Sequence, residues 1–192
     1  MASEKKLSFP RKHIFARGAI MELWDIYDEN RALKNETMVR GEQIKDGDYH
    51  LVIHVCVFNN KGEMLIQKRQ PFKSGYSGLW DVTVGGSAVS GDTSRKAAER
   101  ELFEEVGIQH DFTGIQPHLT LNFYHGFDDI YLIEKEVDIS TLKLQYEEVE
   151  KVMWADEEQI LAMIESGEFI PYYPELIRLL FTMRGPLGAH KR

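Results

Sequence analysis

Segments in which apolar and polar residues alternate account for much of this chain. A period of two is the pattern of a strand with one buried face, and clusters of Gly, Asn and Asp mark the turns between strands. The pattern predicts strands in MELWDIYDEN (21–30), YHLVIHVCVFNNKGEMLIQKR (49–69, two strands joined by NNKG), GLWDVTVGG (78–86, ended by its paired glycines), PHLTLNFYH (117–125), DDIYLIEKEVDI (128–139) and VEKVMWAD (149–156). The polar stretch that follows the first of these segments is expected to be a connection.

A helical period replaces the alternation in three places. The first helix is expected to begin at Asp92 or Thr93, either of which can cap it, and to end at Gly107. DEEQILAMIESG (156–167) and YYPELIRLLFTMRG (172–185) are the other two. Many strands mixed with three helices predict an α+β fold, in which helices cover a mixed sheet.

A length of 192 residues favours one domain with a short N-terminal extension. We divide the chain into an N-terminal arm (1–20), an N-terminal strand region packed on the core (21–48), a main domain (49–184) and a C-terminal tail (185–192). The arm is basic and has no continuous apolar run, so a secretory signal is not expected.

Composition excludes several classes of function. A formal charge of −8 argues against non-specific nucleic-acid binding, which needs a basic face. Cys56 is the only cysteine, which rules out an internal disulfide and favours a reducing, cytoplasmic compartment. No apolar run approaches the roughly 18–20 residues of a membrane span, so no membrane partner is expected. The pattern leaves a homodimer open.

The segment VGGSAVSGDTSRKAAERELFEEVGI (84–108) concentrates carboxylates on the first helix. Glu101, Glu104 and Glu105 fall within roughly 100° of one another around the helix axis, and Arg100 lies beside them. A solvated face is the ordinary explanation of a Glu-rich helix. Like charges at these spacings repel, however, and oxygen ligands of this kind suit hard cations such as Mg²⁺ or Mn²⁺. The preceding Gly85 can offer a backbone carbonyl to the same ion.

This segment resembles the Nudix box, G-x5-E-x7-R-E-U-x-E-E-x-G-U, in which U is a bulky aliphatic residue. The matching residues are Gly86, Arg100, Glu101, Leu102, Glu104, Glu105, Gly107 and Ile108. Asp92 stands where the family has its first Glu, so one carboxylate is a methylene shorter. The resemblance extends roughly from Tyr49 to Arg184. It implies the Nudix fold, an α/β/α sandwich.

The resemblance also implies hydrolysis of a nucleoside diphosphate linked to another group X, with water attacking phosphorus and Mg²⁺ or Mn²⁺ as cofactor. The substrate is then a small diphosphate, a nucleotide derivative. Gly85, Glu101, Glu104 and Glu105 are the expected metal ligands, with Arg100 orienting an acid. The general base is either a box glutamate or one of a later pair, Glu147 and Glu148, for which a solvated turn is the alternative; Glu148 is our candidate.

The N-terminal half resembles Nudix proteins related to isopentenyl-diphosphate isomerases. There an Arg and a Lys four residues later bind the diphosphate, and Arg69 and Lys73 have that spacing; a hydrated surface pair is the alternative. Isomerisation needs a cysteine and a histidine where this chain has Gly85 and Ser87. An isomerase is therefore the second hypothesis. A catalytically silent module that senses a nucleotide is the third, although such modules usually lose the box acids.

Aromatic residues gather in NFYHGFDD (122–129), which we expect to contain a turn. An aromatic side chain at a turn can stack on a base, and Phe127 is our candidate for this contact with the substrate. Its alternative is a place in the core. His54 and Cys56 share one face of an apolar strand, and we expect a core histidine and an inert thiol.

Overall fold

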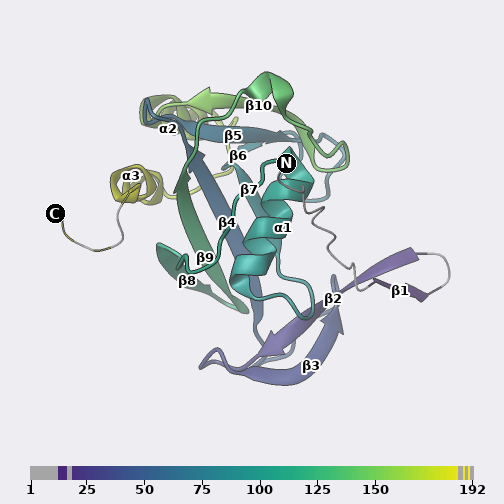
Figure 1. The fold of residues 1–192 in the computed structure, drawn as a ribbon. Helices are drawn as coiled ribbons and strands as arrows, with labels where there is room; N and C mark the ends of the chain where they lie inside the picture. Colours follow the sequence, from purple (N-terminus) through teal and green to yellow (C-terminus); the bar gives the residue numbers. More distant parts are fainter. Residues whose placement is uncertain (1–12, 17–18, 186–187, 189, 191–192) are drawn as a thin grey trace, which may run out of the picture.

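The computed structural model describes residues 13–16, 19–185, 188 and 190, which form two β-sheets and three α-helices (Figure 1). The smaller sheet contains β1 (His13–Ala16), β2 (Ala19–Tyr27) and β3 (Leu33–Val39). The larger sheet contains β4 (His50–Phe58), β5 (Met64–Arg69), β6 (Trp80–Asp81), β7 (Val84–Ser87), β8 (Leu119–Phe123), β9 (Gly126–Glu134) and β10 (Val149–Ala155). The helices are α1 (Ser94–Val106), α2 (Glu157–Ser166) and α3 (Pro174–Met183), with a 3-10 turn at Ile139–Thr141.

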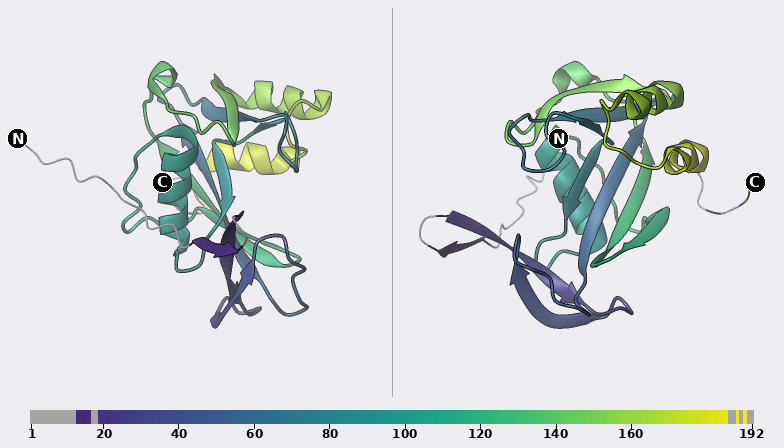
Figure 2. Two further views of the ribbon diagram at one scale, coloured as in Figure 1. Left: turned by 90° about the vertical axis from the view of Figure 1, so that its right-hand side faces the viewer. Right: turned by 180° about the vertical axis from the view of Figure 1, so that it is seen from behind.

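Strand β4 divides the interior into two cores. Its odd-numbered residues, such as Ile53 and Val55, pack with Leu102 of α1, whereas Cys56 and Phe58 pack with residues of α2 and α3. Because successive side chains of a strand point to opposite faces, one apolar strand can supply both cores. Figure 2 shows α1 on one side of the sheet and α2 and α3 on the other. The predicted α+β arrangement of helices around a mixed sheet is confirmed.

The larger sheet splits beside its central strand. β4 and β5 pair only at Phe58 and Met64, and then diverge. Beyond that point β7 pairs with β4 and β6 pairs with β5. On its other side β4 runs parallel to β9 over nine residue pairs from His50–Gly126 to Phe58–Glu134. The split therefore leaves the ends of β5, β6 and β7 beside α1, where side chains from different segments can meet.

The caps of α1 agree with the sequence pattern. The side chain of Thr93 accepts a hydrogen bond from the Lys96 amide, so Thr93 and not Asp92 is the N-cap. Gly107 ends the helix at φ 74°, a left-handed conformation that favours glycine. Asp92 is thus available for another contact.

The smaller sheet is attached to the larger one by an aromatic stack. The rings of Trp24 and His50 lie 4.3 Å apart with an interplanar angle of 6°, and Phe123 meets the same imidazole edge-on. Arg31, at φ 62°, donates two hydrogen bonds to the buried carboxylate of Asp129. The prediction that residues 21–48 pack on the core remains an interpretation that these contacts favour.

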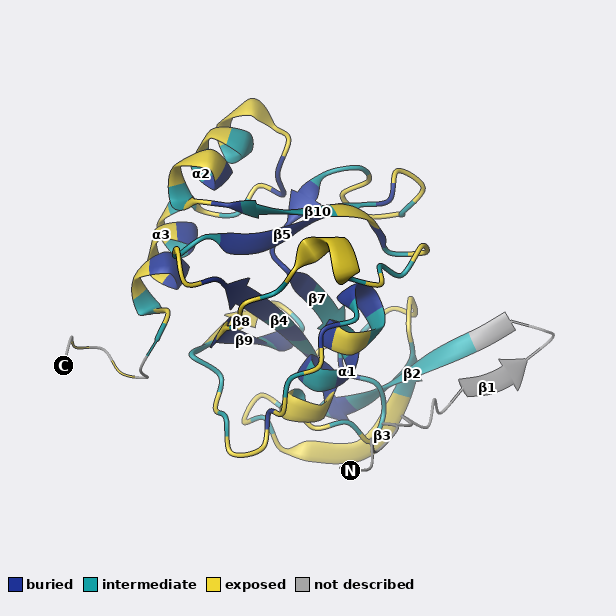
Figure 3. Cartoon of the chain, turned by 45° about the horizontal axis from the view of Figure 1, so that its top comes forward, coloured by how far each residue is buried: buried dark blue, intermediate teal, exposed yellow. Residues whose placement is uncertain are grey.

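Three details of the expected element pattern are wrong. Residues 33–39, expected to lie in a connection, form β3, most of which is exposed (Figure 3). Segment 78–86 forms two short strands, and its paired glycines lie within β7 instead of ending it. Part of the expected arm, residues 13–16, pairs with β2. The remainder of the arm to residue 12 and most of the C-terminal tail lie outside the described residues.

Within the described ranges, no helix is long and apolar enough to cross a bilayer.

His50 makes stability depend on pH. Burial, and then the nearby positive charges of His125 and Arg40, lower the pKa of His50 from 6.5 to about 4. Its Nδ1 atom has no hydrogen-bond partner among the described residues. Between about pH 6.5 and pH 4, His50 therefore binds a proton in the unfolded chain but not in the folded protein. The stability of the fold consequently decreases as the pH falls through that window.

We expect His50→Phe, which keeps an aromatic ring against Trp24, to lose less stability than the parent between pH 7 and pH 4. The difference should be on the order of 1 to 3 kcal/mol, because a tenfold change in proton affinity is worth about 1.4 kcal/mol. Urea unfolding at several pH values measures it. His190→Gln, at an exposed position, should track the parent. Parallel pH profiles of the parent and His50→Phe would contradict the assignment.

Candidate active site

Arg100, a buried residue in the middle of α1, is the centre of a charge network with half-buried acids. Its Nε donates to Asp92 Oδ2 at 3.0 Å, and one terminal nitrogen donates to Glu101 at 2.7 Å and to Glu104 at 3.4 Å. The other terminal nitrogen donates to the Ser87 carbonyl of β7 at 3.4 Å. Burial alone would lower the pKa of Arg100, but the charges of Glu101 and Asp92 outweigh it and raise that pKa. The guanidinium is therefore permanently charged and orients three carboxylates.

Glu105 lies deeper, one turn along the helix. It is only 5% exposed, and its carboxylate accepts a hydrogen bond from the side chain of Gln67 on β5 at 2.9 Å. Burial first, and then the charge of Glu101, raise the pKa of Glu105 well above its ordinary range, while the Gln67 hydrogen bond opposes this. Burial also raises the pKa of Glu101, although Arg100 offsets part of the effect. Such a pair of acids is more stable when a cation lies between them.

The paired glycines of β7 allow this close packing. A Cβ atom at Gly86 would lie 2.6 Å from the carboxylate of Glu101, and a Cβ atom at Gly85 would lie 2.7 Å from the ring of His54. Any side chain at either position would push the neighbouring group away. The glycines are thus required by the approach of two functional side chains to the backbone.

The donor chemistry of this face fits a hard divalent cation. Its side-chain ligands are all carboxylate oxygens, and the buried acid Glu105 needs positive charge beside it to ionise. Within the part of the chain that the structure describes, no group of three or more His, Cys, Asp or Glu side chains is already arranged to hold a metal ion. Glu101 and Glu104 instead contact Arg100, so a cation would share these acids with the guanidinium.

The predicted phosphate-binding and base residues lie at the ends of β5 and β10. Arg69 lies at the end of β5, 3.7 Å from Asp81 of β6, and its Nε donates to the Gly75 carbonyl at 3.2 Å. Lys73 forms an ion pair with Glu148, so the predicted phosphate ligand and the predicted base contact each other. These segments lie beside the box acids, because the Gln145 amide donates to the Glu105 carbonyl at 2.9 Å.

A second polar cluster, which the sequence did not reveal, lies on the α3 side of the sheet. Nδ1 of His54 is 2.8 Å from Asp128, and the Tyr172 hydroxyl donates to Asp81 at 2.8 Å and lies 3.3 Å from Nε2 of His54. Burial disfavours the imidazolium, but the hydrogen bond and charge of Asp128 outweigh it and raise the pKa of His54. The expectation of a core histidine is thus incomplete, since His54 belongs to a half-buried charge network.

Two further predictions concern residues outside this region. Phe127 lies in β9 and not in a turn, is 7% exposed, and packs on Tyr49 beneath the guanidinium of Arg31. The expected turn within residues 122–129 is confirmed at 124–125, and Phe127 lies outside it. Its contact with the substrate stays a prediction. The expected burial of the Cys56 thiol is confirmed, and this burial raises its pKa. Its inertness stays a prediction.

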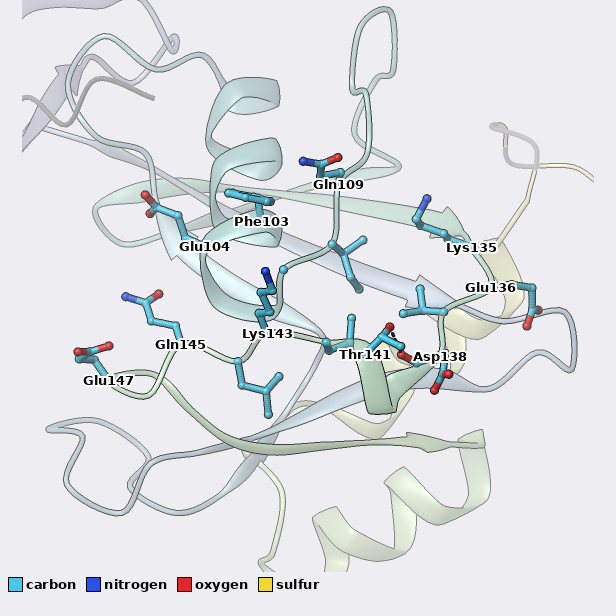
Figure 4. Close-up of a pocket in the computed structure, with 15 residues that line it drawn as sticks. Phe103, Glu104, Gln109, Lys135, Glu136, Asp138, Thr141, Lys143, Gln145 and Glu147 are labelled. Carbon is cyan, nitrogen blue, oxygen red and sulfur yellow. Dashed lines mark hydrogen bonds between the residues drawn. The ribbon is translucent and has the colours of Figure 1, made fainter. Parts of the chain in front are cut away.

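The helix α1, which carries the acids Glu101, Glu104 and Glu105, is called the box helix below. An open groove of about 1240 Å³ begins at its exposed edge. Figure 4 shows Glu104 of α1 and Glu147 of the turn before β10 at one end of the groove, and Lys135 and Glu136 at the other. Glu147 is exposed, whereas Glu148 is half-buried. The two glutamates of the pair therefore lie in different surroundings.

Comparison with known proteins gives consistent results. A family model described as the NUDIX domain matches residues 48–176. An uncharacterized Nudix hydrolase of Listeria monocytogenes is 46% identical over 170 residues, which cover 88% of this chain and 99% of that protein. An isopentenyl-diphosphate Delta-isomerase of Corynebacterium diphtheriae is 27% identical over 143 residues, covering 69% and 78%. A solved structure from Deinococcus radiodurans, 23% identical, has a TM-score of 0.67 over 83% of this chain and 99% of its own, and shows the same fold.

The contact between Asp92 and Arg100 predicts how the shortened carboxylate acts. We expect Asp92→Ala to reduce activity or metal affinity roughly 10–100-fold, because Arg100 would lose one of the acids that orient it. Asp92→Glu should stay within a few-fold of the parent, since it can still accept from Arg100. Steady-state rates titrated against Mg²⁺ measure both effects. An alanine variant with the parent's rate and metal dependence would show that this contact is only structural.

Proposed function

The chain belongs to the Nudix hydrolase family, and from this premise we propose that it hydrolyses, with Mg²⁺ or Mn²⁺, the diphosphate linkage of a nucleoside diphosphate joined to another group X. The observation that carries the proposal is the box helix, on which a buried Arg100 orients acids beside a buried Glu105. A silent module would have no need to bury Glu105 beside a half-buried Glu101 at an energetic cost.

We assign the site residues as follows. Glu101, Glu104, Glu105 and the carbonyl of Gly85 would hold the cation. When bound, it would neutralise charge on the phosphoryl oxygens and activate a water for attack on phosphorus. Arg69 and Lys73 would bind the remaining phosphoryl oxygens. Glu148 is a better candidate than Glu147 for the general base outside the box, because it is half-buried in a segment attached to the end of α1.

Isomerisation of isopentenyl diphosphate is the less favoured alternative. Gly85 occupies the position of the isomerase cysteine. A Cβ atom added at Gly85 would lie 2.7 Å from the ring of His54, which occupies the space that a side chain would need. A cysteine could not be accommodated there unless His54 moved away from Asp128. The acid–base chemistry of an isomerase therefore has no counterpart at this position. A homodimer and a cytoplasmic location stay predictions.

A substrate panel tests the reaction class. Nucleoside triphosphates, dinucleoside polyphosphates, nucleotide sugars, ADP-ribose, NADH and isopentenyl diphosphate would each be incubated with Mg²⁺ or Mn²⁺. We expect metal-dependent release of a monophosphate from at least one of them, detected by chromatography. Isomerisation of isopentenyl diphosphate above background would reverse the order of the two hypotheses.

Glu105→Gln separates catalysis from folding. The amide keeps the shape of the side chain and can still pair with Gln67, but it removes the charge. We expect the rate to fall by at least about 10²-fold, the scale of a lost catalytic or electrostatic group. Without metal, the melting temperature should stay level or rise, because repulsion from Glu101 disappears.

Glu99→Gln is the matched control for this experiment. Glu99 is a half-buried glutamate of the same helix that interacts with the charge of Asp111. Its variant should keep activity within about two-fold of the parent, as expected for a substitution away from the site. An unfolded Glu105→Gln protein, or one with full activity, would show that the carboxylate face has a structural role.

A further inference from the structure

The ion pair between Lys73 and Glu148 joins two residues that the reaction needs apart. Lys73 would bind a phosphoryl oxygen and Glu148 would accept a proton. In the structure, however, the ammonium group of Lys73 is paired with the carboxylate of Glu148. The pair is partly shielded from water, since the two side chains are 18% and 28% exposed. A carboxylate oxygen that accepts a hydrogen bond from an ammonium group is less available to a water molecule.

The backbones on both sides of this pair are held by other contacts. The Gln70 amide donates to the Glu148 carbonyl at 3.0 Å, and the Gln70 side chain donates to the Val149 carbonyl at 3.3 Å. The rings of Phe72 and Tyr146 also meet, with centroids 5.7 Å apart. The ion pair can therefore open by rotation of side chains while the two segments stay together.

Glu148 is also close to the box acids. Its charge contributes to the raised pKa of Glu105, and the turn that carries it is attached to the Glu105 carbonyl through the Gln145 amide. The ammonium of Lys73 lies on a flexible four-carbon stem with three donors, so it can move to a nearby acceptor of higher charge. A phosphoryl group bound beside the box acids is such an acceptor.

We propose that Lys73 and Glu148 form a latch that a diphosphate opens. The proposal rests on the proposed function. A substrate with two linked phosphoryl groups places one against the box acids and the other within reach of Lys73, which leaves Glu148. The freed carboxylate then takes a proton from the attacking water, the water oxygen bonds to phosphorus, and the bridging P–O bond breaks with its electron pair on the leaving group. A single phosphoryl group does not reach both places and leaves the latch closed.

Competition for Lys73 gives the latch a measurable signature. Because only the open fraction of the protein binds a diphosphate well, removal of the competing carboxylate should tighten binding while it abolishes the base. We expect Glu148→Gln to bind methylenediphosphonate about five-fold more tightly than the parent and to lose at least about 10²-fold in kcat. A carboxylate that only stabilised its turn would weaken binding when removed.

Lys73→Met should have the opposite signature. In this variant Glu148 has no ammonium partner and can act as the base, but the phosphate-binding ammonium of Lys73 is missing. We therefore expect KM to rise about ten-fold or more, with a much smaller fall in kcat. Calorimetric titration with methylenediphosphonate at fixed free Mg²⁺ measures the binding of each variant, and steady-state kinetics on a substrate from the panel measures kcat and KM.

The chain offers a matched control in the pair Lys68–Glu150, which joins β5 and β10 themselves at 3.7 Å and is more exposed than Lys73–Glu148. Glu150→Gln removes the same charge and Lys68→Met the same cation, so these variants account for the general effect of charge on anion binding. Both should keep the parent's kcat and affinity within about two-fold.

The outcomes separate the latch from the proposed function. If Glu148→Gln binds methylenediphosphonate no more tightly than Glu150→Gln, or if no variant binds it, the latch is wrong even when the parent hydrolyses a diphosphate. A kcat that falls as far in Lys73→Met as in Glu148→Gln would also overturn it, because Lys73 would then be needed to position the base. If no panel substrate is hydrolysed, the proposed function fails. The binding data still show whether Lys73 leaves Glu148 when a diphosphate binds.

Discussion

The site depends on one buried cation, the guanidinium of Arg100. A buried charge is very costly without partners, and here the partners come from three places: Asp92 before α1, the helix acids Glu101 and Glu104, and the Ser87 carbonyl of β7. The same contacts thus fix the start of the helix, the direction of its acids and its distance from the sheet. Loss of one acid would leave the cation partly unpaired within the fold.

The split of the sheet gives this network its surroundings. If β4 and β5 had stayed paired beyond Phe58 and Met64, their backbones would occupy the space where the box helix meets the sheet. Instead β6 and β7 follow the two diverging strands, and Gly86 of β7 admits the carboxylate of Glu101. The deepest acid, Glu105, reaches Gln67 of β5 from the same helix. The open sheet and the small residues together allow Glu105 to be buried beside the half-buried Glu101.

Local features were predictable from the sequence, and long-range pairings were not. The caps and period of α1 depend on residues within one helix, so the pattern placed Gly107 and narrowed the N-cap to Asp92 or Thr93. Strand β3 was missed because most of it is exposed and has no apolar face to alternate. Lys73 and Glu148 are 75 residues apart, and no spacing rule joins them. The error for Phe127 arose because a two-residue turn left more of the segment in β9 than expected.

The charges of the described site residues indicate how a diphosphate could approach it. Six carboxylates belong to the site: Asp81, Asp92, Glu101, Glu104, Glu105 and Glu148. Three cations oppose them, and each already contacts at least one of these acids: Arg69, Lys73 and Arg100. The excess is negative even when Glu105 is protonated, so the field would repel a free diphosphate. A cation that arrives with the substrate or before it reverses this repulsion, which makes binding, and not only the chemical step, dependent on the metal.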